Sequence, residues 1–278
     1  MGGFLVYIFL WYTAFVNNLS MDWLFWFIIG GSGLILGSYL NSWMWRIYTN
    51  RWQWGGRSLC VHCGRQLTWS ENIPLLSFVV LRGQCRTCHQ RIPPDYFWVE
   101  LVTPILFVLA ASIDLVHGIT NPWHIWRDLF FVALLLVIFV YDAKYYLILT
   151  RVVYGGAVVG FLINYVVLHI SPVNMLLGAV VGAGFFWTQY VLSRGRWIGG
   201  GDVRLGLMMG ILLGWPGVLV ALFMAYVLGA FVSLGLLALR KKTLRSQLPF
   251  GTFLAIGTLV ALFWGEQIIQ WYLGFIRW

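Results

Sequence analysis

Long apolar stretches, separated by short segments that hold most of the charged residues, run through almost the whole chain. An α-helix needs roughly 17–25 apolar residues to cross the hydrocarbon core of a bilayer. Stretches of that length occupy residues 23–45, 98–117, 126–142, 152–170, 173–192, 217–239 and 251–273. A shorter run from Leu205 to Leu213 predicts either a half-depth helix or, when the residues before it extend it, an eighth crossing. The pattern predicts an all-α polytopic membrane protein with about eight transmembrane helices.

The first 22 residues form a separate apolar segment. No positive charge precedes the apolar run from Phe4 to Val16 and no small-residue cleavage site follows it, so we do not expect a cleaved signal peptide. We treat residues 1–22 as an N-terminal apolar extension, with Met21 as a second plausible start. It forms either a further helix or an interfacial segment, so eight and nine spans both stay open.

The charged residues fix the orientation of these spans. The chain has 278 residues, of which 60% are hydrophobic and 10% charged, whereas a soluble domain carries about 25% charged residues. Sixteen of the eighteen Lys and Arg fall in four segments, 46–91, 144–151, 194–204 and 240–245. The positive-inside rule places such segments on one cytoplasmic face. The net charge of +9 therefore indicates membrane orientation, and we expect no nucleic-acid partner.

Four cysteines stand in two closely spaced pairs within the longest basic segment. The pairs are Cys60-Val-His-Cys63 and Cys85-Arg-Thr-Cys88, separated by 21 residues. Two such knuckles supply the four thiolates that structural zinc prefers. Disulfides are disfavoured in a reducing cytoplasm, and unconnected buried thiols are the other alternative. We predict that residues 46–97 form a small cytoplasmic zinc-binding domain between the first span at 23–45 and the rest, with His62 and His89 beside the ligands.

Two aspartates stand at the ends of apolar runs. Asp202 follows three glycines at residues 199–201 and begins the shorter run, and Asp142 ends the run from Leu129 to Tyr141. Alone, Asp142 reads equally well as an ordinary helix-end charge. A carboxylate at the margin of hydrocarbon is costly, however, and the charge pattern puts both acids on the same side of the membrane. Two adjacent carboxylates can share one proton between acid and base roles, which is aspartyl protease chemistry.

Some polar residues have simpler explanations. Glu100 stands at the start of a predicted helix, where the helix dipole favours an acid, and a role in substrate binding is the alternative. The glycines at 206, 210 and 214 make one flat helix face, on which a helix or an extended peptide can lie. Small residues at 33, 37 and 38 predict close helix packing. We expect the following residues to be solvated loop residues on the external side: Asp114, His117, His124 and Asp128.

From about Gly33 to the last helix, the sequence resembles the type IV prepilin peptidase family, the bifunctional leader peptidases and N-methyltransferases of pilus and type II secretion systems. The longest similar run extends from Glu71 to Cys88. Further similar pieces are the opening helix at 33–41, the first knuckle at 58–63, the GxGD motif at 199–202 and the closing Pro-Phe-Gly at 249–251.

The resemblance implies a multi-pass protein of the bacterial inner membrane whose catalytic residues are Asp142 and Asp202. Its substrate would be a prepilin or pseudopilin, cut on the cytoplasmic side between a glycine that ends the basic leader and the residue, often Phe, that starts the apolar helix. The methyltransferase activity would use S-adenosylmethionine. No glycine-rich Rossmann loop is present, so the residues that bind this cofactor stay unassigned.

The sequence departs from the family pattern in one three-residue stretch and at three single positions. The family usually has an Ile-Pro-Asp-like turn where this chain has Ile148-Leu149-Thr150. The other departures are Arg204 where Lys is common, Thr252 where Pro is common, and Phe97 where Pro is common. The first departure concerns the loop that follows Asp142.

Two alternatives remain beside a membrane aspartyl protease domain at residues 98–278. One is a proton- or cation-coupled transporter that uses the paired aspartates, and the other is a presenilin-like protease that shares only GxGD. The similar run at 71–88 argues against both. The cysteine-bearing loop either meets the methyl donor and the new N-terminus or serves only to position the substrate.

Overall fold

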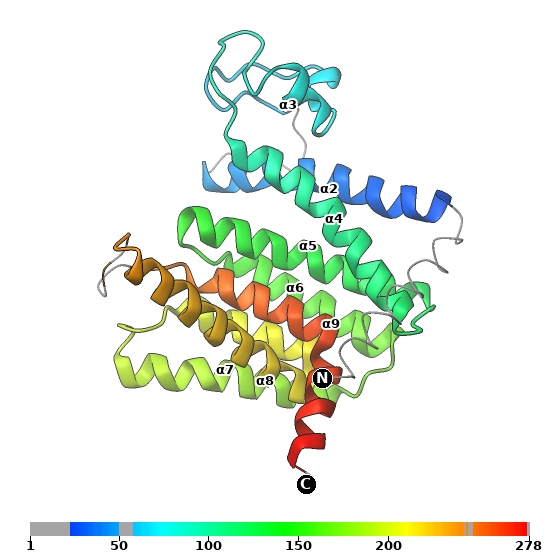
Figure 1. Cartoon of the computed structure of the whole chain (residues 1–278), viewed down its shortest axis with the longest axis vertical. Helices are drawn as coiled ribbons and strands as arrows, with labels where there is room; N and C mark the ends of the chain where they lie inside the picture. The colour runs from blue at the N-terminus through cyan, green and yellow to red at the C-terminus, as the bar shows by residue number, and fades with distance from the viewer. Residues whose placement is uncertain (1–22, 50–57, 242, 244–246, 277–278) are drawn as a thin grey trace. The chain divides into compact units, whose positions relative to one another are not determined.

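The structure, a computed structural model, describes residues 23–49, 58–241, 243 and 247–276 (Figure 1). The N-terminal extension predicted at residues 1–22 lies outside the described residues. Within them, the chain is helical, and its β pairing is confined to two isolated bridges, Leu59 with Gln66 and Gln84 with Arg91. The predicted all-α class is confirmed.

Seven helices of the described residues are long and apolar enough to cross a membrane, and each overlaps a predicted span. They are α2 (Trp23–Tyr48), α4 (Pro94–Val116), α5 (Pro122–Tyr145), α6 (Thr150–Leu162) with its π-helical continuation η2 (Ile163–Val167), α7 (Pro172–Ser193), α8 (Gly200–Ala238) and α9 (Phe250–Ile276). Two short helices, η1 (Trp69–Asn72) and α3 (Leu76–Val80), lie in the cysteine-bearing segment.

Helix α8 contains both the short predicted run and the span after it. Its 39 residues would extend about 58 Å as one straight helix, but Gly214 and Trp215 have non-helical backbone angles. Gly178 of α7 lies against both Gly210 and Gly214, and Gly182 lies against both Gly206 and Val218. Because residues from both halves of α8 meet the same glycines, the chain reverses direction at the break.

Two asparagines pair with the backbone groups that this reversal leaves without helical partners. Asn174 Oδ1 accepts the N–H of Trp215 at 2.7 Å. Asn164 Nδ2 donates to the carbonyl oxygens of Ile211 and Leu212, each at 3.3 Å. A backbone polar group buried away from water costs free energy unless it is hydrogen-bonded. With α8 counted as two segments, the described residues contain eight long helical segments, as predicted.

The chain divides into two compact units, residues 1–119 and 120–278. In the first unit α2 packs on α4, with Gly33 against Pro104 and Gly37 against Thr103. Asn41 Nδ2 donates to the carbonyl oxygen of Tyr96 at 2.9 Å. The close packing predicted from small residues is therefore confirmed, while the functional boundary placed at residues 97 and 98 stays a prediction.

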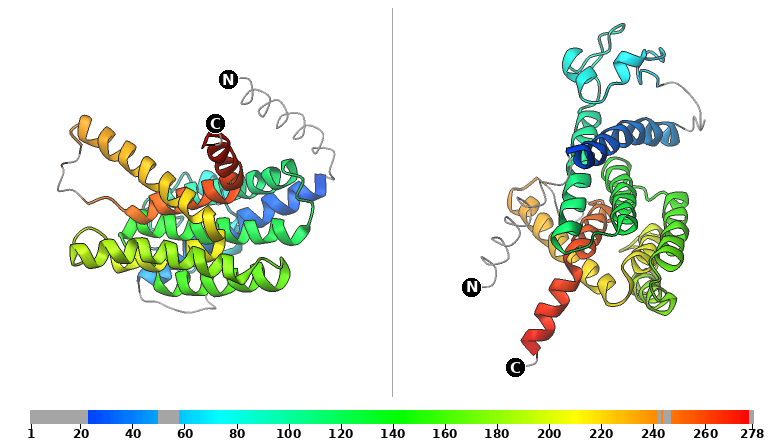
Figure 2. Two further views of the ribbon diagram at one scale, coloured as in Figure 1. Left: turned by 90° about the horizontal axis from the view of Figure 1, so that it is seen from below. Right: turned by 90° about the vertical axis from the view of Figure 1, so that its right-hand side faces the viewer.

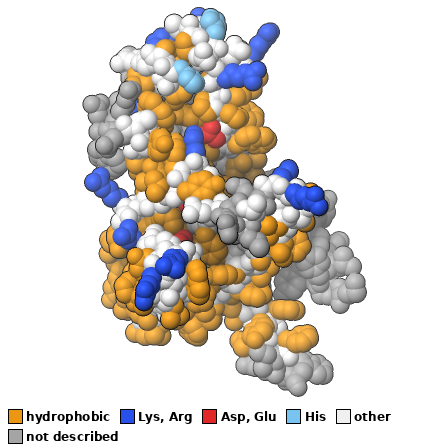
Figure 3. Space-filling view, turned by 90° about the vertical axis from the view of Figure 1, so that its left-hand side faces the viewer, with side chains coloured by type: hydrophobic (Ala, Val, Ile, Leu, Met, Phe, Trp, Pro, Cys, Tyr) orange, Lys and Arg blue, Asp and Glu red, His pale blue; other side chains and the backbone are white. Residues whose placement is uncertain are grey.

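In the second unit, α5 to α9 form a bundle with a continuous apolar core (Figure 2). The face formed by Gly206 and Gly210 is covered by α7, whose Gly182 and Gly178 lie directly opposite. Of the two occupants predicted for this face, the structure shows a helix. Figure 3 shows a mainly hydrophobic surface on which Lys and Arg side chains stand out and Asp and Glu are scarce.

We expected the polar residues around the loop between α4 and α5 to be solvated, and this was wrong for both acids. Asp114 and Asp128 are only 3% and 2% exposed. Asp128 Oδ1 accepts the Nε–H of Arg127 at 2.6 Å. A buried carboxylate needs such a partner because desolvation is costly. The sequence did not indicate this burial, because burial of an acid depends on which residues pack around it.

The glycine contacts of α7 give a direct test of the bundle. A methyl group on Gly182 would collide with the backbone of Gly206, whereas one on Gly184 of the same helix would meet nothing within 4 Å. Gly182→Ala should lower the free energy of unfolding in detergent by about 1–3 kcal/mol. Gly184→Ala should leave it unchanged or raise it by up to about 1 kcal/mol. Equal effects would contradict the packing.

Candidate functional site

Asp142 lies in the last turn of α5 and is only 4% exposed. Its Oδ2 accepts the backbone N–H of Thr252 at 2.9 Å. Thr252 belongs to the first turn of α9, where the first N–H groups of a helix have no partner within the helix. The partial positive charge of a helix start favours an anion there. The start of α9 thus forms part of the Asp142 site, 110 residues away along the chain.

Gly251 is required for this contact. A methyl group on Gly251 would lie 2.8 Å from Asp142 Oδ2 and 3.2 Å from Ile148 Cδ1. Sequence reasoning singled out Pro249-Phe250-Gly251 only as a closing signature and assigned it no role. A glycine at the start of a helix was the available signal, but nothing in the sequence pointed to its partner.

Asp202 lies in the first turn of α8 and is 8% exposed. Its Oδ2 accepts the N–H of Gly199 at 3.1 Å, so the carboxylate caps its own helix. A methyl group on Gly201 would lie 3.1 Å from Ile148 Cβ. Because Ile148 also adjoins Gly251, its side chain lies between the first turns of α8 and α9.

The structure therefore brings the two predicted acids to the same end of the second unit, close enough for their charges to interact. Two buried carboxyl groups in this arrangement can bind a water molecule and a carbonyl group between them. One carboxyl group then acts as the acid and the other as the base. Tyr226 lies near enough to Asp202 to be affected by its charge, and the Tyr226 hydroxyl donates to Gln189 Oε1 at 3.0 Å. The Tyr226 ring also packs edge-on against Phe250 with centroids 5.1 Å apart.

Two departures from the family pattern contact each other. Arg204 Nη1 donates to Thr150 Oγ1 at 2.6 Å. Arg204 follows Asp202 by two residues, and Thr150 begins α6 after the loop that follows Asp142. This hydrogen bond therefore ties together the two segments that carry the acids.

The four cysteines converge in the first unit. Their Sγ atoms all lie within 4.8 Å of one another, and the group could hold a metal ion. The Sγ atoms of Cys60 and Cys88 are 3.9 Å apart. A zinc ion with Zn–S bonds of about 2.3 Å requires tetrahedral sulfur pairs separated by roughly 3.8 Å. The residues therefore fit zinc, and none of the four forms a disulfide.

The two knuckles have matching backbone hydrogen bonds. The N–H of Gly64 donates to the carbonyl of Cys60, and that of His89 donates to the carbonyl of Cys85, each at 3.0 Å. Neither histidine belongs to the cluster, and a ring nitrogen of His62 lies 3.1 Å from the carbonyl oxygen of Arg91.

The backbone N–H groups of Cys88 and Thr87 lower the pKa of the Cys85 thiol to about 6. Thiolates are the form that binds metal.

An ion pair supports this segment. Arg65 Nη2 lies 2.6 Å from Glu71 Oε1, and the hydrogen bond from Arg65 lowers the pKa of Glu71 to about 2. The pKa of Glu71 in the folded protein lies below its ordinary value of 4.5, so the ion pair contributes its full stability above pH 4.5. It is lost as the pH falls towards about 2.

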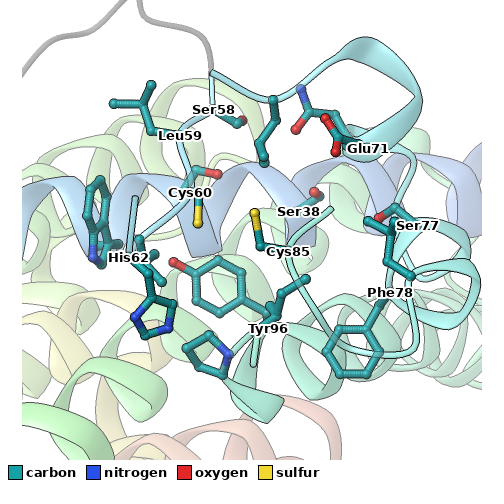
Figure 4. Close-up of a pocket in the computed structure, with 18 of the residues that line it drawn as sticks. Ser38, Ser58, Leu59, Cys60, His62, Glu71, Ser77, Phe78, Cys85 and Tyr96 are labelled. Carbon is teal, nitrogen blue, oxygen red and sulfur yellow. The ribbon is translucent and has the colours of Figure 1, made fainter. Parts of the chain in front are cut away.

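A cavity of about 100 Å³ lies between the cysteine-bearing segment, α2 and α4 (Figure 4). Cys60 and Cys85 line it, together with Tyr96. Glu100 lines it as well, and its Oε2 accepts the N–H of Leu75 at 2.8 Å. Sequence reasoning considered only the helix dipole and substrate binding for Glu100 and missed this link to the loop.

Two family models cover most of the chain. The "Bacterial Peptidase A24 N-terminal domain" matches residues 32–113, and the "Type IV leader peptidase family" matches residues 129–234. The first match contains the four cysteines, and the second contains both aspartates.

Relatives from three bacteria match over almost their full length. A protein of Aeromonas hydrophila is 31% identical over 91% of this chain and 96% of its own, and one of Bacillus subtilis is 32% identical over 87% and 95%. One of Legionella pneumophila is 27% identical over 92% and 97%. Each is named prepilin leader peptidase/N-methyltransferase. No solved structure matches this chain. On these matches, the chain belongs to the type IV leader peptidase family.

Proposed function

We propose that this chain is a membrane aspartyl endopeptidase that removes the leader of type IV prepilins or pseudopilins and then N-methylates the new N-terminus. The observation that carries the peptidase proposal is the pair of buried acids, Asp142 and Asp202, at one end of the second unit. The names of the relatives supply the substrate class and the second activity.

In the proposed mechanism the two carboxyl groups share one proton. The ionised carboxylate takes a proton from a water molecule, and the protonated one polarises the carbonyl of the scissile bond. We leave the two roles unassigned because coupled acids titrate as a pair. The glycines at 199–201 let the backbone of the substrate approach Asp202 without a side-chain collision.

The same acids would also suit a proton-coupled transporter. The relatives described above are named as peptidases, so the transporter alternative is not supported. In addition, both carboxylates lie at helix ends, beside the backbone N–H groups of Thr252 and Gly199. A proton path across the membrane would also need acceptors farther along the bundle.

We propose that the four cysteines bind one structural zinc ion. With four sulfur ligands the ion would have no open position for substrate, so its contribution is to hold the two knuckles together. Cys60 and Cys85 line the cavity, and the ion would therefore also fix the shape of that wall.

For the methyltransferase step we propose that the cavity receives S-adenosylmethionine or the new amino terminus. Its lining combines apolar groups such as Phe78 with polar groups such as Ser38 and Glu100, as small-molecule sites usually do. It is also remote in sequence from the two aspartates. This separation in sequence supports the proposal that the two activities depend on different residues.

We further propose that the cysteine-bearing segment and both aspartates face the cytoplasm of a bacterium, with the spans in its inner membrane. The basic residues support this orientation, because Arg46 lies in the last turn of α2, Lys144 lies in the last turn of α5 and Arg194 follows α7.

The acids give the first test of this function. Asp142→Asn and Asp202→Asn should each reduce cleavage of a prepilin by about 10²–10⁴-fold or more, because each removes one half of the acid–base pair. Membrane insertion should be unchanged, since Asn has nearly the same volume. Glu266→Gln, at an exposed acid of α9, is the control and should cleave normally. Substantial processing by either Asn variant would refute the pair.

Gly251 gives a second test, of the geometry around Asp142. The methyl group of Gly251→Ala would displace the Asp142 carboxylate, and a shift of about 1 Å at a catalytic group can reduce the rate about 10²-fold. The control is Gly155→Ala, where a methyl group meets nothing within 4 Å. Rates of prepilin cleavage should separate the two variants. Equal rates would show that the contact with α9 is unimportant.

The cysteines give a third test, of how the two activities divide. The double substitution Cys60→Ser and Cys63→Ser should remove the one zinc ion per chain that metal analysis of the parent protein should find. Methylation should fall more than cleavage, measured by mass spectrometry as the methylated and the cleaved fractions of the pilin. If cleavage is lost first, the segment is a scaffold for the protease site. A disulfide or an absence of zinc in the parent protein would contradict the metal proposal.

A further inference from the structure

Helix α3 turns apolar side chains outward from the cysteine-bearing segment. Leu76, Val79 and Val80 are 56%, 63% and 70% exposed, and their spacing of three and four residues puts them on one face of the helix. Ser77 and Phe78 point the other way and line the cavity (Figure 4). A soluble loop would bury this face, so its exposure needs an explanation.

Contacts with α4 place α3 beside the membrane spans. The N–H of Leu75, the residue before α3, donates to Glu100 Oε2 at 2.8 Å. Glu100 lies six residues after the start of α4, which is about 9 Å along the helix axis. The start of α3 is therefore level with the second turn of a transmembrane helix.

Contacts with α2 also place the segment beside a membrane span. Ser38 of α2 lines one cavity with Ser77 and Phe78 of α3. Ser38 lies ten residues before α2 ends at Tyr48, which is about 15 Å along the axis. The cysteine-bearing segment therefore lies along the last turns of α2 rather than beyond them.

Exposed aromatic rings mark this level as a membrane–water interface. Tyr39, next to Ser38, is 47% exposed, and Trp98, two residues before Glu100, is 59% exposed. Trp69 of η1 is 82% exposed. Trp and Tyr are enriched where membrane spans meet the headgroups.

The charges near α3 suit anionic lipid. Arg82, Arg86 and Arg91 are exposed after α3. Glu71 is the only acid in residues 58–93, and Arg65 already neutralises it. Basic side chains beside an apolar helix face attract anionic headgroups, and their long stems let the charge reach the phosphates.

We propose that the face formed by Leu76, Val79 and Val80 inserts into the lipid leaflet that borders the cysteine-bearing segment. An interfacial helix buries its apolar face about 5–10 Å into the boundary between headgroups and acyl chains. The position of α3 beside the second turn of α4 allows such insertion. The segment is then held by the bilayer at α3 as well as by α2 and α4. This proposal does not depend on the catalytic roles of the aspartates.

The test places a genetically encoded fluorescent amino acid at Val79 of the full chain, in nanodiscs that contain phosphatidylglycerol and one chain each. Iodide probes exposure to water, and lipids brominated near the headgroup end of the acyl chain probe insertion. Gln66, an exposed residue of the same segment, is the matched control position. Brominated lipid should quench fluorescence at position 79 several-fold more than fluorescence at position 66. Iodide should quench fluorescence at position 66 several-fold more than fluorescence at position 79.

A label at Val80 should repeat the result, and zinc content equal to that of the unlabelled chain should confirm that each variant is folded. Equal iodide quenching at positions 79 and 66 would overturn the proposal. So would shielding at position 79 that develops only when prepilin is added, because the face would then bind substrate. Shielding found only in vesicles that hold several chains would also overturn it and would assign the face to a second copy.

Discussion

The proposed peptidase site depends on one constraint, the burial of two carboxylates next to hydrocarbon. An isolated buried carboxylate is costly, and here each is stabilised by a backbone N–H at a helix start, Thr252 for Asp142 and Gly199 for Asp202. Glycine is needed beside both acids because a side chain at 251 would displace one carboxylate and one at 201 would collide with Ile148. The reversal in α8 returns the chain to the end at which α8 began, so the first turn of α9 can meet Asp142 there.

Much of this architecture could be predicted from the sequence because the signals are local. Each apolar stretch of sufficient length became a helix, and the short run at residues 205–213 became the first half of α8. The cysteine pairs converged because each knuckle is a tight turn and the intervening chain is short. The two acids could be selected because charge is rare in these stretches and basic loops fix which end of each span they occupy.

The rest depends on contacts between distant segments, which a single sequence does not encode in a readable form. The partner of Asp142 comes from α9, and Ile148 contacts both Gly201 and Gly251 only in three dimensions. Asp114 and Asp128 were assigned to a solvated loop because burial of an acid depends on its neighbours. The cavity at Glu100 likewise forms only when the cysteine-bearing segment folds back along α2.

The central claim is that one chain both cuts a prepilin and methylates the product. The most direct measurement incubates the purified protein with a prepilin and S-adenosylmethionine and determines the N-terminus of the product by mass spectrometry. We predict a mature pilin that has lost its leader after the glycine and carries one added methyl group on the new N-terminus. An intact prepilin, or cleavage at another bond, would contradict it.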